Sequence, residues 1–159
     1  MSSPQINLFG DEWEDGRDRP GWRWKWLPVG RRLGAKELGA SLYELEPGQK
    51  TFPYHFHYAL EEWLIVLRGK PTLRDPDGER RLAPGDCVLF PRGPQGAHQV
   101  RNDTEEPVRL LVLSSMAEVD VAVYPDSGKV GAMVRVEGLD PYRLVVREDS
   151  AVDYFEGEE

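Results

Sequence analysis

The chain has little sulfur and no long apolar run. Cys87 is the only cysteine among 159 residues, so an internal disulfide is impossible. The longest apolar runs, such as Trp63–Leu67 and Leu110–Leu113, fall far short of the roughly 20 residues that span a bilayer. The N-terminal residues MSSPQINLFGDEWEDG lack the basic and apolar regions of a secretory signal. We therefore expect a soluble, cytoplasmic protein that has no membrane partner.

Basic residues are also in short supply. Lys and Arg number 20 against 28 Asp and Glu, which gives a net charge of -8 and a pI near 5.0. Surfaces that bind nucleic acid carry basic patches that displace counterions from phosphates, and this composition argues against such a surface. Nucleic acid is therefore not an expected partner, and a small-molecule ligand or substrate is favoured.

A sustained helical apolar stripe is missing as well, except for a weak one after Asp149. Thirteen prolines and sixteen glycines separate short segments rich in Val, Leu, Ile, Trp and Tyr, which is typical of an all-β sandwich or barrel. Asp75–Gly78 and Pro125–Gly128 predict hairpin tips, because glycine supplies the positive φ of a tight reversal. The expected strands are Trp22–Leu27, Leu38–Leu45, His55–His57, Glu62–Arg68, Pro71–Arg74, Arg80–Leu82, Cys87–Phe90, His98–Arg101, Val108–Ser114, Val119–Tyr124, Val130–Val136 and Tyr142–Arg147.

The length and the strand pattern predict one domain over residues 1–159. Within Glu62–Leu67, apolar side chains occupy both alternating faces of the expected strand. Such a strand needs cover on both sides, from another sheet, the N-terminal segment or a neighbouring subunit. We expect a homodimer on this ground. The polar N-terminal and acidic C-terminal ends either fray or dock on a partner chain.

Two of the three histidines, His55 and His57, stand two residues apart. In a strand, residues at this spacing point the same way and lie roughly 6.5–7 Å apart, so both imidazoles can converge on one ion. Glu62 begins the next strand, and His98 follows the loop PRGPQGA. The alternative is a pair of solvated histidines on a strand edge, with His98 alone in its loop. These side chains are therefore candidate metal ligands.

Further residues give this constellation a recognisable spacing. The chain resembles the cupin superfamily, whose two motifs combine Gly, HxH, Glu and Gly, then Gly, Pro, Gly, His and Asn. The first motif has six residues before its HxH where the family usually has five, and the second has four before its His where the family usually has two. Pro94, Gly96 and His98 offer an alternative alignment of the second motif. The residues that carry the resemblance are Gly48, His55, His57, Glu62, Gly69, Gly85, Pro91, Gly93, His98 and Asn102.

The resemblance implies a double-stranded β-helix, or jelly-roll barrel, with extra N-terminal and C-terminal strands. Its core would occupy about 38–115, and the extensions 1–37 and 116–159 would pack on the barrel or on a dimer partner. It also implies that His55, His57, Glu62 and His98 bind a metal at the mouth of the barrel. A mixed nitrogen and oxygen set of this kind suits Fe, Mn, Ni, Co, Cu or Zn, and the residues do not select one of them. We expect no organic cofactor.

Open metal positions would allow several functions. We expect a metal-dependent enzyme on a small polar or aromatic molecule, an oxidoreductase of the oxygenase type ahead of an isomerase or lyase. The alternatives are a non-catalytic binding or sensor module with a structural metal, and a structural protein whose metal site is vestigial. The sequence assigns no catalytic residue.

Other conspicuous residues have simpler interpretations. The three tryptophans of Trp22–Trp26 share one strand face, and covering the barrel or a subunit seam is favoured over stacking on a ligand. Tyr54 and Tyr58 should point away from the cavity, and Glu61 should be an exposed turn carboxylate rather than a base. Cys87 is expected to be a buried, inert thiol.

Overall fold

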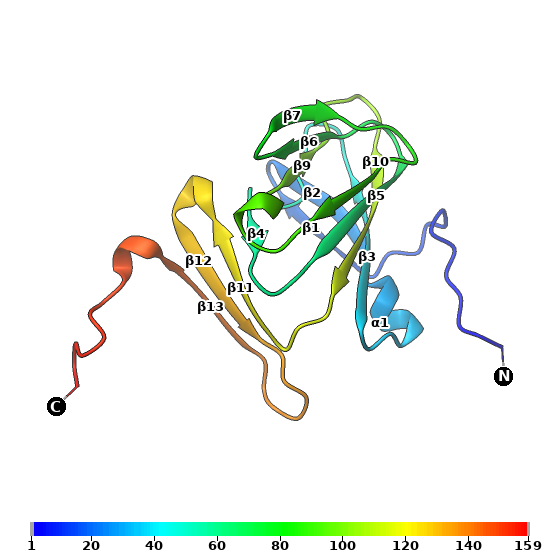
Figure 1. The fold of residues 1–159 in the computed structure, drawn as a ribbon. Helices are drawn as coiled ribbons and strands as arrows, with labels where there is room; N and C mark the ends of the chain where they lie inside the picture. The colour runs from blue at the N-terminus through cyan, green and yellow to red at the C-terminus, as the bar shows by residue number, and fades with distance from the viewer. Residues whose placement is uncertain (1, 159) are drawn as a thin grey trace.

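Three antiparallel sheets form the framework of the computed structural model, which describes residues 2–158 (Figure 1). The largest sheet has the order β1 (Asp15–Arg19), β2 (Trp22–Leu27), β3 (Leu38–Leu45), β10 (Val108–Ser115), β5 (Glu62–Arg68) and β8 (Cys87–Phe90). The second contains β13 (Tyr142–Arg147), β12 (Lys129–Val134), β11 (Val119–Tyr124) and β4 (Phe56–His57). The third contains β7 (Gly78–Arg81), β6 (Thr72–Asp75) and β9 (Gln99–Arg101). The helices are α1 (Val29–Leu33) and the 3-10 turns η1 (Pro94–Gly96), η2 (Pro125–Ser127) and η3 (Glu148–Ser150).

The two smaller sheets are connected through the chain segment before β4. Isolated antiparallel bridges pair Lys50 with Arg101 and His55 with His98, so this segment lies beside β9. The predicted all-β jelly-roll barrel is confirmed. Each predicted strand is found with its ends within two residues of the prediction, and η1 lies in the loop before His98. No helix in the described part of the chain has the length and apolar character needed to cross a bilayer.

The core of the barrel is mainly aliphatic. Alternating residues of β3, β5 and β10 point into it, as expected for strands with one buried face. Trp24 packs at its margin, which agrees with the prediction that this tryptophan covers the barrel. The buried core residues are Leu45, Leu64, Val66, Leu73, Leu82, Phe90, Val100, Val108 and Leu110.

The N-terminal segment and α1 cover part of the outer face of the largest sheet. Ile6, Leu8 and Trp13 pack against a second buried cluster that contains Leu27 and Leu42. The segment therefore docks on its own chain, one of the covers predicted for the second apolar face. The sequence did not predict β1 or α1, because β1 is entirely polar and α1 has only five residues.

A buried charge cluster holds this segment in place. Arg109, which is 4% exposed, donates from Nε and Nη2 to Glu44 Oε2 at 3.0 and 2.6 Å. Its Nη1 donates to the carbonyl oxygens of Leu8 and Gly10 at 3.2 and 2.9 Å. Lys25 Nζ lies 2.8 Å from the other oxygen of Glu44. The cluster satisfies a buried guanidinium and carboxylate that would otherwise be costly.

β11, β12 and β13 form an arm that extends from the barrel (Figure 1). In antiparallel pairs, facing residues point to the same side, so the strand register defines two faces. The inner face, which continues from His57, carries Asp120, Ala122, Tyr124, Lys129, Gly131, Met133, Arg143, Val145 and Arg147. The outer face carries Val119, Val121, Val123, Val130, Ala132, Val134, Tyr142, Leu144 and Val146. Every residue of β13 is exposed, so the arm has apolar surface without cover within the described chain.

One prediction about the large sheet is wrong. Cys87 is exposed rather than buried. It pairs with Ile65 on the outer face, beyond the part that the N-terminal segment covers, so alternation along β8 turns its thiol outward.

Candidate metal centre

Three of the four predicted ligands form one compact group. The ligand atoms of His55, Glu62 and His98 all lie within 4.8 Å of one another. His55 and His98 are held by reciprocal main-chain hydrogen bonds, His55 N to His98 O at 3.1 Å and His98 N to His55 O at 2.9 Å. Glu62 enters from the first position of β5. This His/Glu/His group is compatible with a bound metal ion, because neutral imidazoles and a carboxylate suit a divalent transition metal.

The fourth predicted ligand, His57, adjoins the group through Glu62. Its Nε2 lies 3.5 Å from Glu62 Oε2, and its ring centroid lies 4.9 Å from that of His55. Its other ring nitrogen, Nδ1, lies 2.6 Å from Asp120 Oδ2. The structure therefore places all four predicted residues at one end of the barrel.

All three histidines are oriented in the same way. His55 Nδ1 donates to the Pro53 carbonyl and His98 Nδ1 to the Gly96 carbonyl, each at 2.9 Å. With Asp120 on His57 Nδ1, every Nδ1 is occupied by an oxygen outside the group. Each imidazole is left with Nε2 as its free ligand atom. Metal-binding histidines are commonly oriented by such hydrogen bonds from the second nitrogen.

Burial sets the charge of the imidazoles of His55 and His98. It lowers the pKa of His55 to about 4, with a further contribution from His57. Burial, with repulsion from His55, lowers the pKa of His98 to about 3. Both rings are therefore neutral near pH 7, the form in which imidazole binds metals.

The pKa values of His57 and Glu62 are instead both raised. Burial acts to lower the pKa of His57, but the hydrogen bond to Asp120 and the charge of Glu62 outweigh it, and the pKa is raised. Burial raises the pKa of Glu62, against the influence of His57. A cation between them would offset the cost of burying this carboxylate.

Aromatic packing fixes the rings of His55 and His98. Phe90 stacks on His98 with ring centroids 3.7 Å apart and planes 4° from parallel, and Tyr124 stacks on His55 at 5.8 Å and 17°. Gly96 has no room for a side chain, since a Cβ there would overlap the Pro91 carbonyl. The loop before His98 can therefore pass close to Pro91 and present the imidazole inward.

Asp120 is the functional residue that sequence reasoning missed. Besides His57, it accepts a hydrogen bond from Ala59 N at 3.1 Å, and it is 3% exposed. These hydrogen bonds outweigh burial and keep the pKa of Asp120 lowered. The available signal was a single acid inside the valine-rich strand VDVAVY, on the face opposite the valines.

Aromatic side chains form one wall beside the ligands. Trp24, Tyr43 and Phe52 contact one another edge-on, with centroids 5.4 to 5.8 Å apart, and Phe52 contacts the ring of His55 at 6.0 Å. Burial raises the pKa of Tyr43 to about 12, so its hydroxyl stays protonated. As predicted, Tyr58 and Glu61 are exposed.

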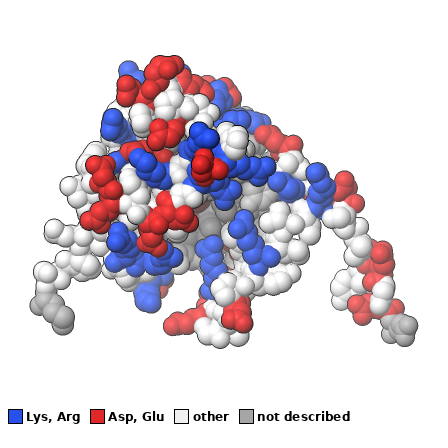
Figure 2. All heavy atoms as spheres, turned by 180° about the vertical axis from the view of Figure 1, so that it is seen from behind, with Lys and Arg blue, Asp and Glu red and all other residues white. Residues whose placement is uncertain are grey.

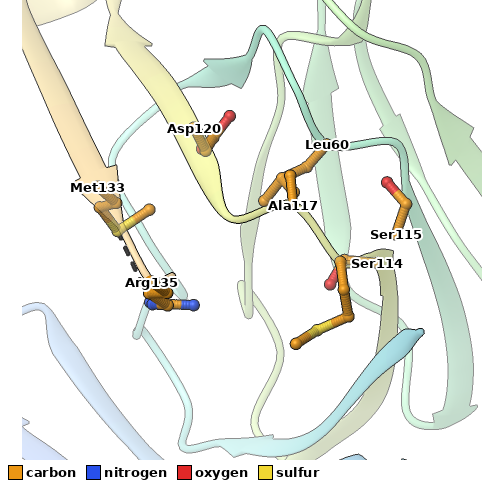
Figure 3. A pocket seen from close by; sticks show the side chains of 8 residues that line it. Leu60, Ser114, Ser115, Ala117, Asp120, Met133 and Arg135 are labelled. Atoms are coloured by element: carbon orange, nitrogen blue, oxygen red, sulfur yellow. Dashed lines mark hydrogen bonds between the residues drawn. The ribbon is translucent and has the colours of Figure 1, made fainter. Parts of the chain in front are cut away.

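A hollow separates the arm from the barrel next to the centre (Figure 3). Asp120 belongs both to this hollow and to the hydrogen-bond network of His57. Met133 and Arg135 line its arm side, and Leu60, Ser114, Ser115, Met116 and Ala117 line the rest.

Solved structures share this architecture along nearly the whole chain. A sugar phosphate isomerase of the cupin superfamily from Silicibacter pomeroyi superposes with a TM-score of 0.79 and 29% identity, over 93% of this chain and 95% of that chain. A protein from Acidithiobacillus ferrooxidans, provisionally assigned as a sugar phosphate isomerase, superposes with a TM-score of 0.74 and 30% identity, over 86% of both chains.

Residues 41–114 match the family described as Cupin domain, and the four predicted ligands lie inside the match. The chain belongs to the cupin superfamily. This cupin is also 29% identical over 131 residues to auxin-binding protein 1 of Arabidopsis thaliana. That similarity covers 77% of the cupin chain and 65% of the relative, so the chain spans just under two thirds of the relative's length.

Proposed function

We propose that this cupin is a metal-dependent isomerase of a small phosphorylated polyhydroxy compound. The observation that carries the proposal is the similarity to two solved structures described as sugar phosphate isomerases, over at least 86% of the chain. A reducing, cytoplasmic setting and a single domain over residues 1–159 belong to the same proposal.

We assign His55, His57, Glu62 and His98 as the metal ligands. The common orientation of the three imidazoles supports this set, since each has an oxygen partner on Nδ1 and a free Nε2. The Nε2 atoms of His57 and His98 lie 3.5 and 3.7 Å from Glu62 Oε2. Fe, Mn, Ni, Co, Cu and Zn all suit these donors. When bound, such an ion would polarise substrate oxygens and favour proton transfer at the neighbouring carbon.

The chain itself provides orientation and exclusion of water. Asp120 fixes the ring of His57, and Phe90 fixes that of His98. The wall of Trp24, Tyr43 and Phe52 closes one side of the centre with apolar rings. Displacement of water from such a site strengthens the electrostatic interactions within it.

Isomerisation takes precedence over the oxygenase chemistry that the sequence led us to expect. Neither of the two solved structures described as isomerases supports oxygenation. Oxygenation therefore stays a prediction that depends on the open metal positions. Non-catalytic binding is the remaining alternative. Turnover of sugar phosphates by the metal-loaded protein, compared with oxygen consumption by the same sample, separates these functions.

Adjacent glutamates provide a matched test of the centre. Glu62→Gln should lower metal affinity about tenfold or more and abolish sugar phosphate isomerisation, because it removes an anionic ligand. Glu61→Gln should retain both, because Glu61 is an exposed neighbour. Metal content is measured by elemental analysis after dialysis against a weak chelator. Equal metal content in the two variants would refute the assigned ligand set.

We also propose that the protein is a homodimer and that the outer face of the arm forms the contact. This face has no charged residue, and Tyr142, Leu144 and Val146 on its β13 edge are 40 to 55% exposed. A second copy presents the same uncharged face, and two sheets can pack over such surfaces about a two-fold axis. A single contact would then cover Tyr142, Leu144 and Val146, the exposed apolar side chains on the outer face of β13.

A further inference from the structure

The inner face of the arm concentrates positive charge in an acidic protein. Lys129, Arg143 and Arg147 share this face in the register of β12 and β13. Arg135, directly after β12, lines the hollow beside Met133 of the same face. Arg74, Arg101 and Arg109 each lie against a carboxylate, but none of the four arm cations forms an ion pair within residues 2–158. The only acid of this face in β11–β13 is Asp120, which is engaged with His57.

Two of the cations stand directly opposite each other. Lys129 and Arg147 are partners in the antiparallel register of β12 and β13. Like charges in this position repel and destabilise a sheet, and among residues 2–158 no carboxylate forms an ion pair with either side chain. An anion between the two side chains would convert this cost into two charge-assisted hydrogen-bonding contacts.

The cation pair is connected to the predicted metal centre through one tyrosine. The Tyr124 ring lies 5.8 Å from the His55 ring, and Lys129 Nζ lies 5.4 Å from the Tyr124 ring. These two distances limit how far the ammonium can be from His55. Figure 2 shows Lys and Arg side chains around a hollow on the face seen from behind. The two distances through Tyr124 keep Lys129 near enough to His55 for a short molecule to span the separation.

We propose that Lys129 and Arg147, supported by Arg143, bind the phosphate group of the substrate whose other end meets the metal. The phosphate subsite extends the proposed function and rests on it, because the proposed function places the reactive end of the substrate at the metal. A phosphate monoester suits the pair because it is doubly charged, and Arg and Lys are well suited to its oxygens. Because the protein has a net charge of -8, its overall charge repels anions. A local basic surface is where an anion would instead be attracted.

The first test measures binding of inorganic phosphate by isothermal titration calorimetry. Lys129→Gln and Arg147→Gln should each weaken phosphate binding about tenfold, the value of one lost charge-assisted contact. Arg19→Gln removes an exposed cation from β1, far along the chain from the arm, and should leave the affinity within about twofold. Absence of phosphate binding by the unaltered protein, or an equal loss in Arg19→Gln, would overturn the proposal.

The second test uses ribose 5-phosphate and inorganic phosphate, each with and without Mn²⁺. Mn²⁺ should strengthen binding of ribose 5-phosphate and leave inorganic phosphate unchanged, because only the sugar phosphate spans both sites. Equal strengthening for both would place the phosphate on the metal and refute the subsite. Binding of phosphate through Lys129 and Arg147 in a protein that retains no metal would refute the proposed function while supporting the subsite.

Discussion

At the scale of single residues, the decisive contact is the one between Asp120 and His57. The HxH spacing predicted which histidines could meet, because alternation along a strand is a local property. It could not predict Asp120, which reaches His57 only because β11 pairs with β4 across a long separation in sequence. The hydrogen bond fixes which nitrogen of His57 faces Glu62.

Removing the charge of this partner should weaken the centre without removing a ligand. Asp120→Asn should lower metal affinity about tenfold to a hundredfold, because it makes His57 a weaker and less well oriented ligand. Titration with Zn²⁺ against a competing chelator measures the effect. Asp126→Asn serves as the control, since Asp126 pairs with Arg74 at the surface. Matching affinities for the two variants would argue against a supporting role for Asp120.

At the scale of elements, the N-terminal segment was the least predictable part of the fold. Its polar sequence was compatible with fraying, and only the tertiary structure reveals that Arg109 binds the Leu8 and Gly10 carbonyls. The strands of the barrel were predictable because their period-two patterns and turn glycines are local signals. A short helix such as α1 carries no comparable signal.

Acid should destabilise this segment through Glu44. Burial acts to raise the pKa of Glu44, but the hydrogen bonds from Lys25 and Arg109 outweigh it and lower the pKa below its ordinary value of 4.5. The ionised form is therefore favoured by folding. Its stabilisation is complete above about pH 4.5 and is lost as the pH falls through the folded-state pKa.

Glu44→Gln should consequently lower the free energy of unfolding by about 3 kcal/mol at pH 7, because it leaves a buried guanidinium without its counterion. The difference from the unaltered protein should shrink below pH 4.5. Urea unfolding at both pH values measures it. Glu46→Gln, a nearby carboxylate outside the cluster, should change stability little. A pH-independent difference for Glu44→Gln would contradict the electrostatic account.

At the scale of the whole molecule, the two faces of the arm have opposite character. Sequence analysis identified both strands and the prospect of a dimer, but not the surface, because the face assignment requires the register of β12 against β13. Leu144 and Val145 are adjacent, each 43% exposed, and point to opposite faces. They form a matched pair for testing the contact.

Leu144→Lys should convert the proposed dimer to a monomer, because it would place a charge in the middle of an apolar contact. Val145→Lys, on the inner face, should remain dimeric. Sedimentation equilibrium at micromolar concentration distinguishes the two masses. A monomeric unaltered protein, or a dimer that survives Leu144→Lys, would exclude this face as the interface.

The main chain of His98, rather than its ring, is what joins it to His55. Since those mutual hydrogen bonds do not involve the imidazole, His98→Gly should keep the backbone path and leave a flat slot beside Phe90. Free imidazole added to the solution should enter that slot and restore much of the lost metal retention. The variant would then bind free imidazole in place of its missing side chain, and titration with imidazole would measure this binding directly.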